Sequence, residues 1–219
     1  MQRLLDICLS FTALIVLAPF LLPVMIILRL TGEREVFYIQ QRAGYKGDKF
    51  GLFKFATMLI DSPNIGTGEL TMRADPRVLP FGKFLRKTKL NELPQLWNIF
   101  IGDMSVVGPR PMVPNTYANY PEATREILNT IRPGLTGIGS IIFRDEESYL
   151  ADSEQPREFY KEHIIPYKCD LEIWYVENNS LWLYIKAILV TVWVVIFPSS
   201  NIADKAFSGI PRLPESLKI

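Results

Sequence analysis

An uncharged run of 22 residues near the start of the chain, Ile7 to Leu28, is the feature that most constrains its fold. At about 1.5 Å per residue an α-helix of this length reaches roughly 33 Å, which is enough to cross the hydrocarbon core of a bilayer. The run is too long for a secretory signal, and no small-residue cleavage site follows it. We therefore expect a membrane-inserted helix that stays on the mature protein.

Two prolines, Pro19 and Pro23, interrupt this run. Each lacks the backbone N–H that an interior helical residue donates, so two consecutive turns lose a hydrogen bond. A kinked spanning helix and a helix-break-helix that enters and leaves on the same face are both compatible with this pattern. Arg3 and Arg29 lie at the two ends and give no clear positive-inside bias.

A second apolar segment, residues 181–198, lies near the end of the chain. It contains Lys186 and is rich in aromatic residues such as Trp182 and Trp193. A second membrane span and an interfacial helix both fit the length, and the lysine and the aromatics favour the interfacial helix.

The residues between these segments predict an α+β fold that is mainly α-helical with a small β-hairpin. The hairpin is expected from Val36–Gly44 and Lys49–Met58, which are rich in β-branched and aromatic residues and flank a turn-forming stretch. Helices are expected over residues 81–87, 92–101, about 115–130, and 155–178 with a bend at Pro166.

The adjacent pair Asn91 and Glu92 opens one of these predicted helices. Asn91 suits the N-cap position, and Glu92 and Pro94 suit the first turn. From Met72 to Leu90, however, the chain carries six basic residues against one acid, and such a cluster also suits a phosphate-bearing ligand. A helix cap and part of an active site are both compatible with the pair at this point.

Cysteine and histidine content narrows the chemistry. Cys8 and Cys169 are far apart, which argues against a disulfide framework and favours a reducing cytoplasmic face. His163 is the sole histidine, so catalysis by histidine or a His-rich metal site is not expected. Two loops dense in Gly and Pro each present an arginine, Arg110 and Arg132, which suits either a phosphate clamp or a stabilised turn.

Several motifs in a fixed order resemble one family. They are QxRxGxxGxxFxxxKF ending at Phe55, DPR at Asp75, LRKT at Leu85, NELPQLWN at Asn91, GDMSxVGPRP at Gly102 and RPGLTG at Arg132, after the helix broken near Pro19. This order is similar to that of the bacterial sugar transferases, the monotopic phosphoglycosyl transferases that start glycoconjugate assembly.

The resemblance implies an activity, partners and a location. The activity is transfer of a sugar 1-phosphate from a UDP-sugar to polyprenyl (undecaprenyl) phosphate with release of UMP, aided by Mg²⁺, in lipopolysaccharide, capsule, exopolysaccharide or glycoprotein assembly. The location is the cytoplasmic face of the bacterial inner membrane, in contact with membrane lipid and ahead of downstream glycosyltransferases. A re-entrant helix broken at Pro19 is implied, a homodimer is compatible with the amphipathic helices, and no nucleic-acid partner is expected.

The resemblance also implies residue roles. In the family an aspartate attacks the β-phosphate and the following glutamate, here Glu92, helps to hold the metal. The cationic residues expected to bind substrate phosphate are Lys54, Arg77, Arg86, Arg110 and Arg132.

The sequence departs from the family where the attacking aspartate is expected, because Asn91 occupies that position. An amide carries no charge and is a very poor nucleophile, so the covalent step does not carry over to Asn91 as written. Ala56 likewise stands where the family usually has arginine.

Several alternatives follow from Asn91. In the first, Glu92 itself attacks the β-phosphate. In the second, the lipid phosphate attacks the β-phosphate directly and Asn91 only orients a phosphate oxygen. In the third, an acid from Asp145–Glu147 replaces the missing carboxylate. Otherwise the chain is a catalytically silent relative that scaffolds other enzymes, or a membrane anchor with an interaction module. A further hypothesis is that the asparagine was introduced in place of the native residue in order to trap substrate.

The expected organisation has three parts. Residues 1–32 form the re-entrant membrane helix, residues 33–198 form the catalytic domain with the interfacial helix 181–198, and residues 199–219 form a C-terminal tail.

Overall fold

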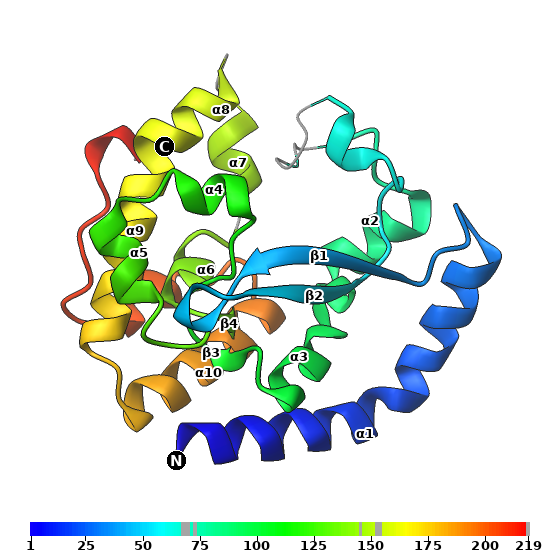
Figure 1. The fold of residues 1–219 in the computed structure, drawn as a ribbon, viewed down its shortest axis with the longest axis horizontal. Helices are drawn as coiled ribbons and strands as arrows, with labels where there is room; N and C mark the ends of the chain where they lie inside the picture. The colour runs from blue at the N-terminus through cyan, green and yellow to red at the C-terminus, as the bar shows by residue number, and fades with distance from the viewer. Residues whose placement is uncertain (67–70, 72–73, 145, 152–154, 218–219) are drawn as a thin grey trace.

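The computed structural model describes residues 1–66, 71, 74–144, 146–151 and 155–217. It begins with one long helix, α1 (Gln2–Leu30), which contains both Pro19 and Pro23. Figure 1 shows that α1 runs along the lower edge of the molecule and then turns upward. The predicted break is therefore a bend within a continuous helix, as expected where prolines remove single hydrogen bonds.

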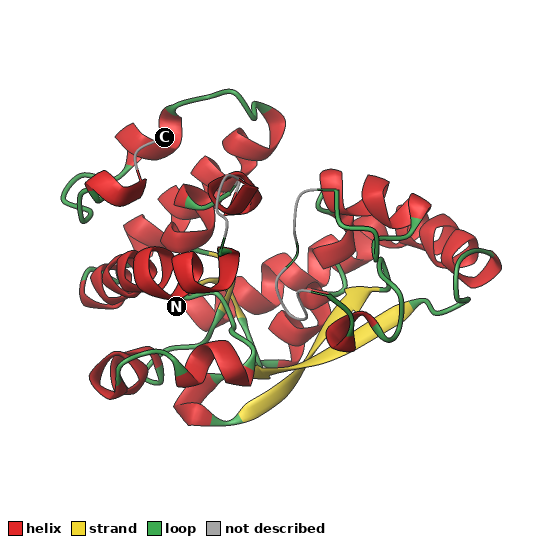
Figure 2. Ribbon diagram, turned by 90° about the horizontal axis from the view of Figure 1, so that it is seen from above, coloured by secondary structure: helices red, strands yellow, loops and turns green. Residues whose placement is uncertain are grey.

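The predicted hairpin is confirmed as β1 (Phe37–Ala43) and β2 (Lys49–Phe55), which pair antiparallel with Tyr38 opposite Lys54. The connecting turn, η1 (Tyr45–Gly47), places Lys46 and Gly47 at positive φ. Figure 2 shows the two long strands crossing one side of the molecule, flanked by helices at both ends.

The segment after the hairpin differs in part from the prediction. The helix expected at residues 81–87 is α2 (Pro80–Lys87). The helix expected from Glu92 begins later: a 3₁₀ turn, η3 (Leu90–Glu92), comes first, and α3 (Gln95–Ile101) follows. Two short parallel strands, β3 (Ser105–Val107) and β4 (Gly134–Thr136), had not been predicted.

The helix predicted over residues 115–130 is two helices, α4 (Pro114–Ala118) and α5 (Glu122–Leu128). Pro121 lies between them in an extended conformation, which ends the first helix and starts the second. Between β4 and the last long helices lie three short helices: α6 (Ile138–Ile142), α7 (Glu146–Ala151) and α8 (Pro156–Phe159).

The bend expected near Pro166 is a π-helical segment, Tyr160–Ile164, that leads from α8 into α9 (Ile165–Glu177). The next helix, α10 (Leu181–Ile196), confirms a helix in the second apolar segment. The segment predicted as a tail contains α11 (Ile202–Ala206) and η5 (Glu215–Leu217).

The largest core forms between α6, α9 and α10, and Phe207 and Leu217 from the C-terminal segment are buried in it. A smaller core joins Leu52 of β2 to α3 and to the middle of α1. The far end of α1 packs in a third core, where Leu28 meets Phe55 and Leu85. Both ends of α1 are therefore anchored on one body.

The N-terminal anchor of α1 is polar. One carboxylate oxygen of Asp6, a residue that is 2% exposed, accepts hydrogen bonds from the Ser105 hydroxyl at 2.9 Å, the Val106 N–H at 2.8 Å and the Tyr184 hydroxyl at 2.7 Å. Arg3 donates to the carbonyls of Ile99 at 2.6 Å and Phe100 at 2.8 Å, which satisfies the C-terminal end of α3.

Candidate functional site

The centre of the candidate site is an ion pair between Glu92 and Arg110. The Arg110 Nη2 donates to Glu92 Oε1 at 2.8 Å, and the side chains are 17% and 42% exposed for Glu92 and Arg110. Glu92 ends the η3 turn, which begins after Lys89 in the left-handed conformation. The pair is thus held by a tight turn on one side and by the loop after β3 on the other.

The Arg110 loop is fixed by its close approach to β4. The Gly108 N–H donates to the Thr136 carbonyl at 2.9 Å, and the Gly134 N–H donates to the Pro109 carbonyl at 2.8 Å. A Cβ on Gly108 would lie 2.4 Å from the carbonyl oxygen of Arg132, so this position has no room for a side chain. The Gly-Pro-Arg order therefore places the guanidinium in a defined position.

Lys54, on β2, belongs to the same electrostatic cluster. Burial and the nearby charges of Arg42, Arg110 and Arg86 lower the pKa of Lys54 to about 7, although the Glu92 charge acts in the opposite direction. These cations crowd one another in a way that an anionic ligand would relieve.

Glu92 stays ionised in this cluster. Burial alone would raise the pKa of Glu92, but the charges of Arg110 and Lys54 outweigh it and lower that pKa to about 2. The Glu92 charge in turn raises the pKa of Arg110 above its ordinary value. The site thus presents a permanent carboxylate beside fixed positive charge.

Asn91 is not the N-cap that the sequence suggested. The α3 helix starts at Gln95 with Pro94 at the cap position, and no side chain caps it. The N–H groups of Leu93 and Leu96 are satisfied by backbone carbonyls three residues earlier, because 3₁₀-type bonds run through this segment. Asn91 is 7% exposed, and its Oδ1 has no hydrogen-bond partner among the described residues.

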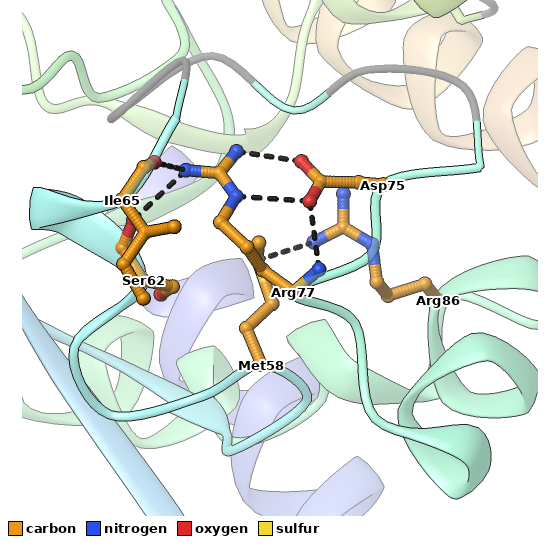
Figure 3. A network of polar contacts seen from close by, with 6 residues as sticks. All are labelled: Met58, Ser62, Ile65, Asp75, Arg77 and Arg86. Atoms are coloured by element: carbon orange, nitrogen blue, oxygen red, sulfur yellow. Dashed lines mark hydrogen bonds and ion pairs between the residues drawn. The ribbon is translucent and has the colours of Figure 1, made fainter.

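The other arginines predicted to bind phosphate have different surroundings. Arg86 lies in the last turn of α2, donates to the sulfur of Met58 at 3.8 Å and points toward Asp75 (Figure 3). Arg77 is 4% exposed and bonds Asp75 through Nε at 2.9 Å and Nη2 at 2.6 Å.

Loop contacts occupy the rest of the Arg77 guanidinium. Its Nη1 donates to the carbonyls of Ser62 and Ile65, each at 2.8 Å (Figure 3). Arg132 lies just before β4, and its Nε donates to the Gly102 carbonyl at 2.8 Å while its guanidinium lies 5.0 Å from the centre of the Tyr45 ring. The structure thus brings Lys54 and Arg110 near Glu92 and Arg86 near Lys54. Arg77 and Arg132 are held instead by Asp75 and by the Gly102 carbonyl.

Sequence reasoning missed Glu172, which comes from α9 and lies behind Arg110. It is 2% exposed, its Oε1 accepts the Arg110 backbone N–H at 3.5 Å, and its Oε2 has no partner among the described residues. Burial raises the pKa of Glu172 to about 7, although the Arg110 N–H and the charges of Lys168 and Arg110 lower it in part. The sequence contained a signal for this residue, because Glu172 is a charged residue on the same helical face as Lys168 and Tyr175 in a largely apolar stretch.

The far wall carries a second ion pair, between Lys168 and Glu146 at 2.7 Å. Lys168 also donates to the Tyr160 hydroxyl at 3.4 Å and lies 5.2 Å from the ring centres of both Phe143 and Tyr160. Of the acids considered as substitute carboxylates, Glu146 is therefore paired, whereas Asp145 and the side chain of Glu147 lie outside the described residues.

These groups line one cleft with a volume of about 2540 Å³. That is more than twice the roughly 300–1000 Å³ typical of small-ligand pockets. The cleft is therefore large enough for more than one small ligand. Its charged lining includes Lys54, Arg86, Glu92, Arg110, Glu146, Lys168 and Glu172.

A family model described as bacterial sugar transferase matches residues 1–198. This chain belongs to the bacterial sugar transferase family.

Curated relatives in this family are named for related activities. An undecaprenyl-phosphate glucose phosphotransferase of Komagataeibacter xylinus is 33% identical over 201 residues, which is 90% of this chain and 36% of the relative. The exopolysaccharide production protein ExoY of Sinorhizobium fredii is 36% identical over 162 residues, 68% of this chain and 71% of the relative. A UDP-glucose:undecaprenyl-phosphate glucose-1-phosphate transferase of Xanthomonas campestris is 31% identical over 193 residues, 87% of this chain and 37% of the relative.

The chain spans only 36% of the length of the Komagataeibacter relative and 37% of the Xanthomonas relative. The predicted resemblance to the bacterial sugar transferases is confirmed. The departure from the family at Asn91 stays a prediction, and in the structure this residue is 7% exposed.

Proposed function

We propose that this sugar transferase moves a sugar 1-phosphate from a UDP-sugar to polyprenyl phosphate and releases UMP. One observation carries the proposal: the ionised Glu92 is paired with Arg110 beside Lys54, in a cleft of a domain that also anchors a long apolar helix. Both substrates are anionic and one has a lipid tail, so the site needs fixed cations close to a bilayer.

The residues offer two routes for the transfer. In the first, an oxygen of the lipid phosphate attacks the β-phosphorus directly, and the bond from that phosphorus to the bridging oxygen breaks, so UMP leaves with the electron pair. In the second, a Glu92 carboxylate oxygen attacks the β-phosphorus, UMP leaves with the electron pair of the broken bond, and an acyl phosphate forms; the lipid phosphate then attacks the same phosphorus and releases the Glu92 carboxylate. In both routes Lys54 and Arg110 neutralise phosphate oxygens, and Asn91 supplies only an amide.

The site fits Mg²⁺ when substrate phosphates and water supply most of the ligands. Among the described residues no group of three or more His, Cys, Asp or Glu is placed to hold a metal. Mg²⁺ in phosphate-transfer sites is commonly held by one or two carboxylates together with substrate phosphates and water. Glu92 supplies one ionised carboxylate, and Asn91 adds an amide oxygen that has no partner in the described chain. When bound, the ion would offset charge on the diphosphate.

The same proposal includes a re-entrant α1 at the cytoplasmic face of the inner membrane. α1 is long and apolar enough to cross a bilayer, as judged by length and composition. A straight helix of 29 residues would separate its ends by roughly 43 Å. The bend at the prolines, and the burial of Asp6 and Leu28 against one domain, support a helix that returns to the side it entered.

UMP release tests the activity. The chain is assayed in nanodiscs with polyprenyl phosphate, Mg²⁺ and a panel of UDP-sugars, alongside Asn91→Asp and Glu92→Gln. We expect turnover in the native chain and its loss in Glu92→Gln. No turnover in the native chain, with turnover gained in Asn91→Asp, would instead identify a catalytically silent relative.

Intact-mass spectrometry separates the two routes. With UDP-sugar and no lipid acceptor, attack by Glu92 adds the mass of a sugar phosphate, and this adduct is absent from Glu92→Gln. Direct attack by the lipid phosphate leaves the native mass unchanged while UMP release with both substrates continues.

Labelling tests the membrane arrangement. Gln2→Cys and Glu35→Cys, each in a Cys8→Ser background, flank α1. A re-entrant helix makes both cysteines react with an impermeant maleimide from the cytoplasmic side of sealed vesicles. Reaction of only one of them from that side would indicate a spanning helix.

A further inference from the structure

One wall of the cleft is an apolar stripe on α10. Ile188, Thr191, Val192 and Val195 line the cleft at helical spacing, Val190 packs into the core, and Val194 is buried in the core and also lines the cleft. Val192 is 51% exposed and Val195 is 53% exposed, so neither serves to fill the core. Side chains of this kind on a polar-lined cleft call for an apolar ligand.

The hydroxyl groups along this stripe are already satisfied. The Thr191 hydroxyl donates to the Ala187 carbonyl at 2.7 Å, and the Thr136 and Thr191 hydroxyl oxygens are 2.7 Å apart. Since Thr191 donates to Ala187, Thr136 is the donor between the two. Neither hydroxyl proton remains available to a polar ligand, so this stretch favours hydrocarbon.

The stripe is continuous with the charged cluster through a shared apolar floor. Leu93, the residue after Glu92, lies in the same small core as Val106 and Leu135. All three line the cleft, as the α10 stripe does, and α10 contacts both β3 and β4. Leu93, Val106 and Leu135 therefore join the cationic cluster beside Glu92 to the apolar stripe on α10, and Arg144 donates to the Val194 and Pro198 carbonyls at the far end of that stripe.

We propose that this groove, formed by Leu93, Val106, Leu135 and the α10 residues Ile188, Thr191, Val192 and Val195, binds the isoprenoid chain of the phosphate acceptor next to its phosphate. The proposal rests on the proposed function and specifies where that acceptor lies. A polyprenyl phosphate has an anionic group joined to a long hydrocarbon, and the cleft has a cationic cluster joined to an apolar stripe.

The outer side of α10 shows where the rest of the chain would go. Leu189 is 62% exposed, Trp193 47% and Ile196 61%, and these side chains do not line the cleft. A helix with one exposed apolar side toward lipid and another toward the cleft gives a hydrocarbon tail a continuous path from the bilayer to the phosphate site.

Photocrosslinking tests this placement without requiring turnover. The full chain in nanodiscs is irradiated with a polyprenyl phosphate that carries a diazirine in its first isoprene units, and labelled peptides are identified by mass spectrometry. We expect labels on the peptide that contains Val192 and Val195, removed by unlabelled polyprenyl phosphate but not by phosphatidylglycerol. Labels confined to α1, or equal competition by phosphatidylglycerol, would overturn the proposal.

Matched isosteric variants provide a kinetic test. Val192→Thr with Val195→Thr adds two hydroxyls to the groove, and Val16→Thr adds one to the exposed side of α1, away from the cleft. We expect the groove variant to raise KM for polyprenyl phosphate about fivefold to tenfold with no change in KM for the UDP-sugar, and the control to stay within about twofold. Equal effects of both variants would contradict the groove.

The two proposals fail separately. Absence of UMP release from the native chain would refute the proposed activity, while the crosslinks would still show whether the groove holds an isoprenoid phosphate. Normal UMP release with crosslinks elsewhere would refute the groove alone.

Discussion

Replacing Asp6 by alanine is expected to destabilise the whole protein, although Asp6 lies outside the catalytic cleft. Its carboxylate accepts three hydrogen bonds that join α1 to β3 and α10, and the residue is 2% exposed. The alanine side chain has no oxygen, so the three donors lose the acceptor that Asp6 provides in the protein interior.

The magnitude follows from which donors can move. The Ser105 hydroxyl can rotate toward another acceptor, but the Val106 N–H is fixed by the backbone and the Tyr184 hydroxyl is buried. A buried donor left without a partner costs about 1–3 kcal/mol, so these two give a loss of roughly 2–6 kcal/mol. For a domain of this size that corresponds to a fall in Tm of roughly 5–20 °C.

The assay is thermal unfolding of the full chain in nanodiscs, followed by tryptophan fluorescence. A double-mutant cycle with Asp6→Ala and Tyr184→Phe isolates the hydrogen bond between the two side chains, for which we expect a coupling of about 1–3 kcal/mol. Ser105→Ala serves as a mild control with a loss of about 1 kcal/mol. A change below about 0.5 kcal/mol for Asp6→Ala, or strict additivity in the cycle, would refute the reasoning.

Two further predictions concern buried charges. Arg77→Met should lower stability by roughly 3 kcal/mol, because it leaves the buried Asp75 without its bidentate partner; thermal unfolding checks this, and Arg77→Met with Asp75→Asn should recover part of the loss. A raised KM for the UDP-sugar at unchanged stability would instead point to phosphate binding by Arg77. Because the pKa of Glu172 is raised to about 7, its ionisation opposes folding, so stability should fall as pH rises from about 4.5 through 7. Glu172→Gln should therefore be more stable than the native chain by up to roughly 3 kcal/mol at pH 8 and show little such gain at pH 4.5; an equal difference in Tm at both values would contradict this.

The long regular patterns predicted their elements well. Strand alternation in Lys49–Phe55 and the apolar runs of α1 and α10 are signals spread over many residues, and each element is present. The strands β3 and β4 have three residues each, which is too few for a periodic signal. They are also distant in sequence, so their pairing is seen only in the folded chain. Pro121 was the overlooked signal that divides α4 from α5.

Local chemistry was harder to predict for side chains with two plausible partners. Asn91 has the residue type of a helix cap, yet the left-handed Lys89 starts a 3₁₀ turn that satisfies the backbone without it. Arg77 and Arg132 suited phosphate as well as any arginine, and only the fold shows that carboxylate, carbonyl and ring contacts surround them. Glu172 was missed because its proximity to Arg110 joins residues 62 positions apart.

The contact between Arg3 and the end of α3 joins the long apolar helix α1 to the segment that carries Glu92. α3 is only seven residues long, and the segment that carries Glu92 immediately precedes it. Arg3 holds the opposite end through the Ile99 and Phe100 carbonyls. If α1 lies in lipid as proposed, a change in bilayer thickness that alters its tilt also pulls on α3. Turnover should then depend on acyl-chain length, which would make the thickness of the host membrane a determinant of the rate.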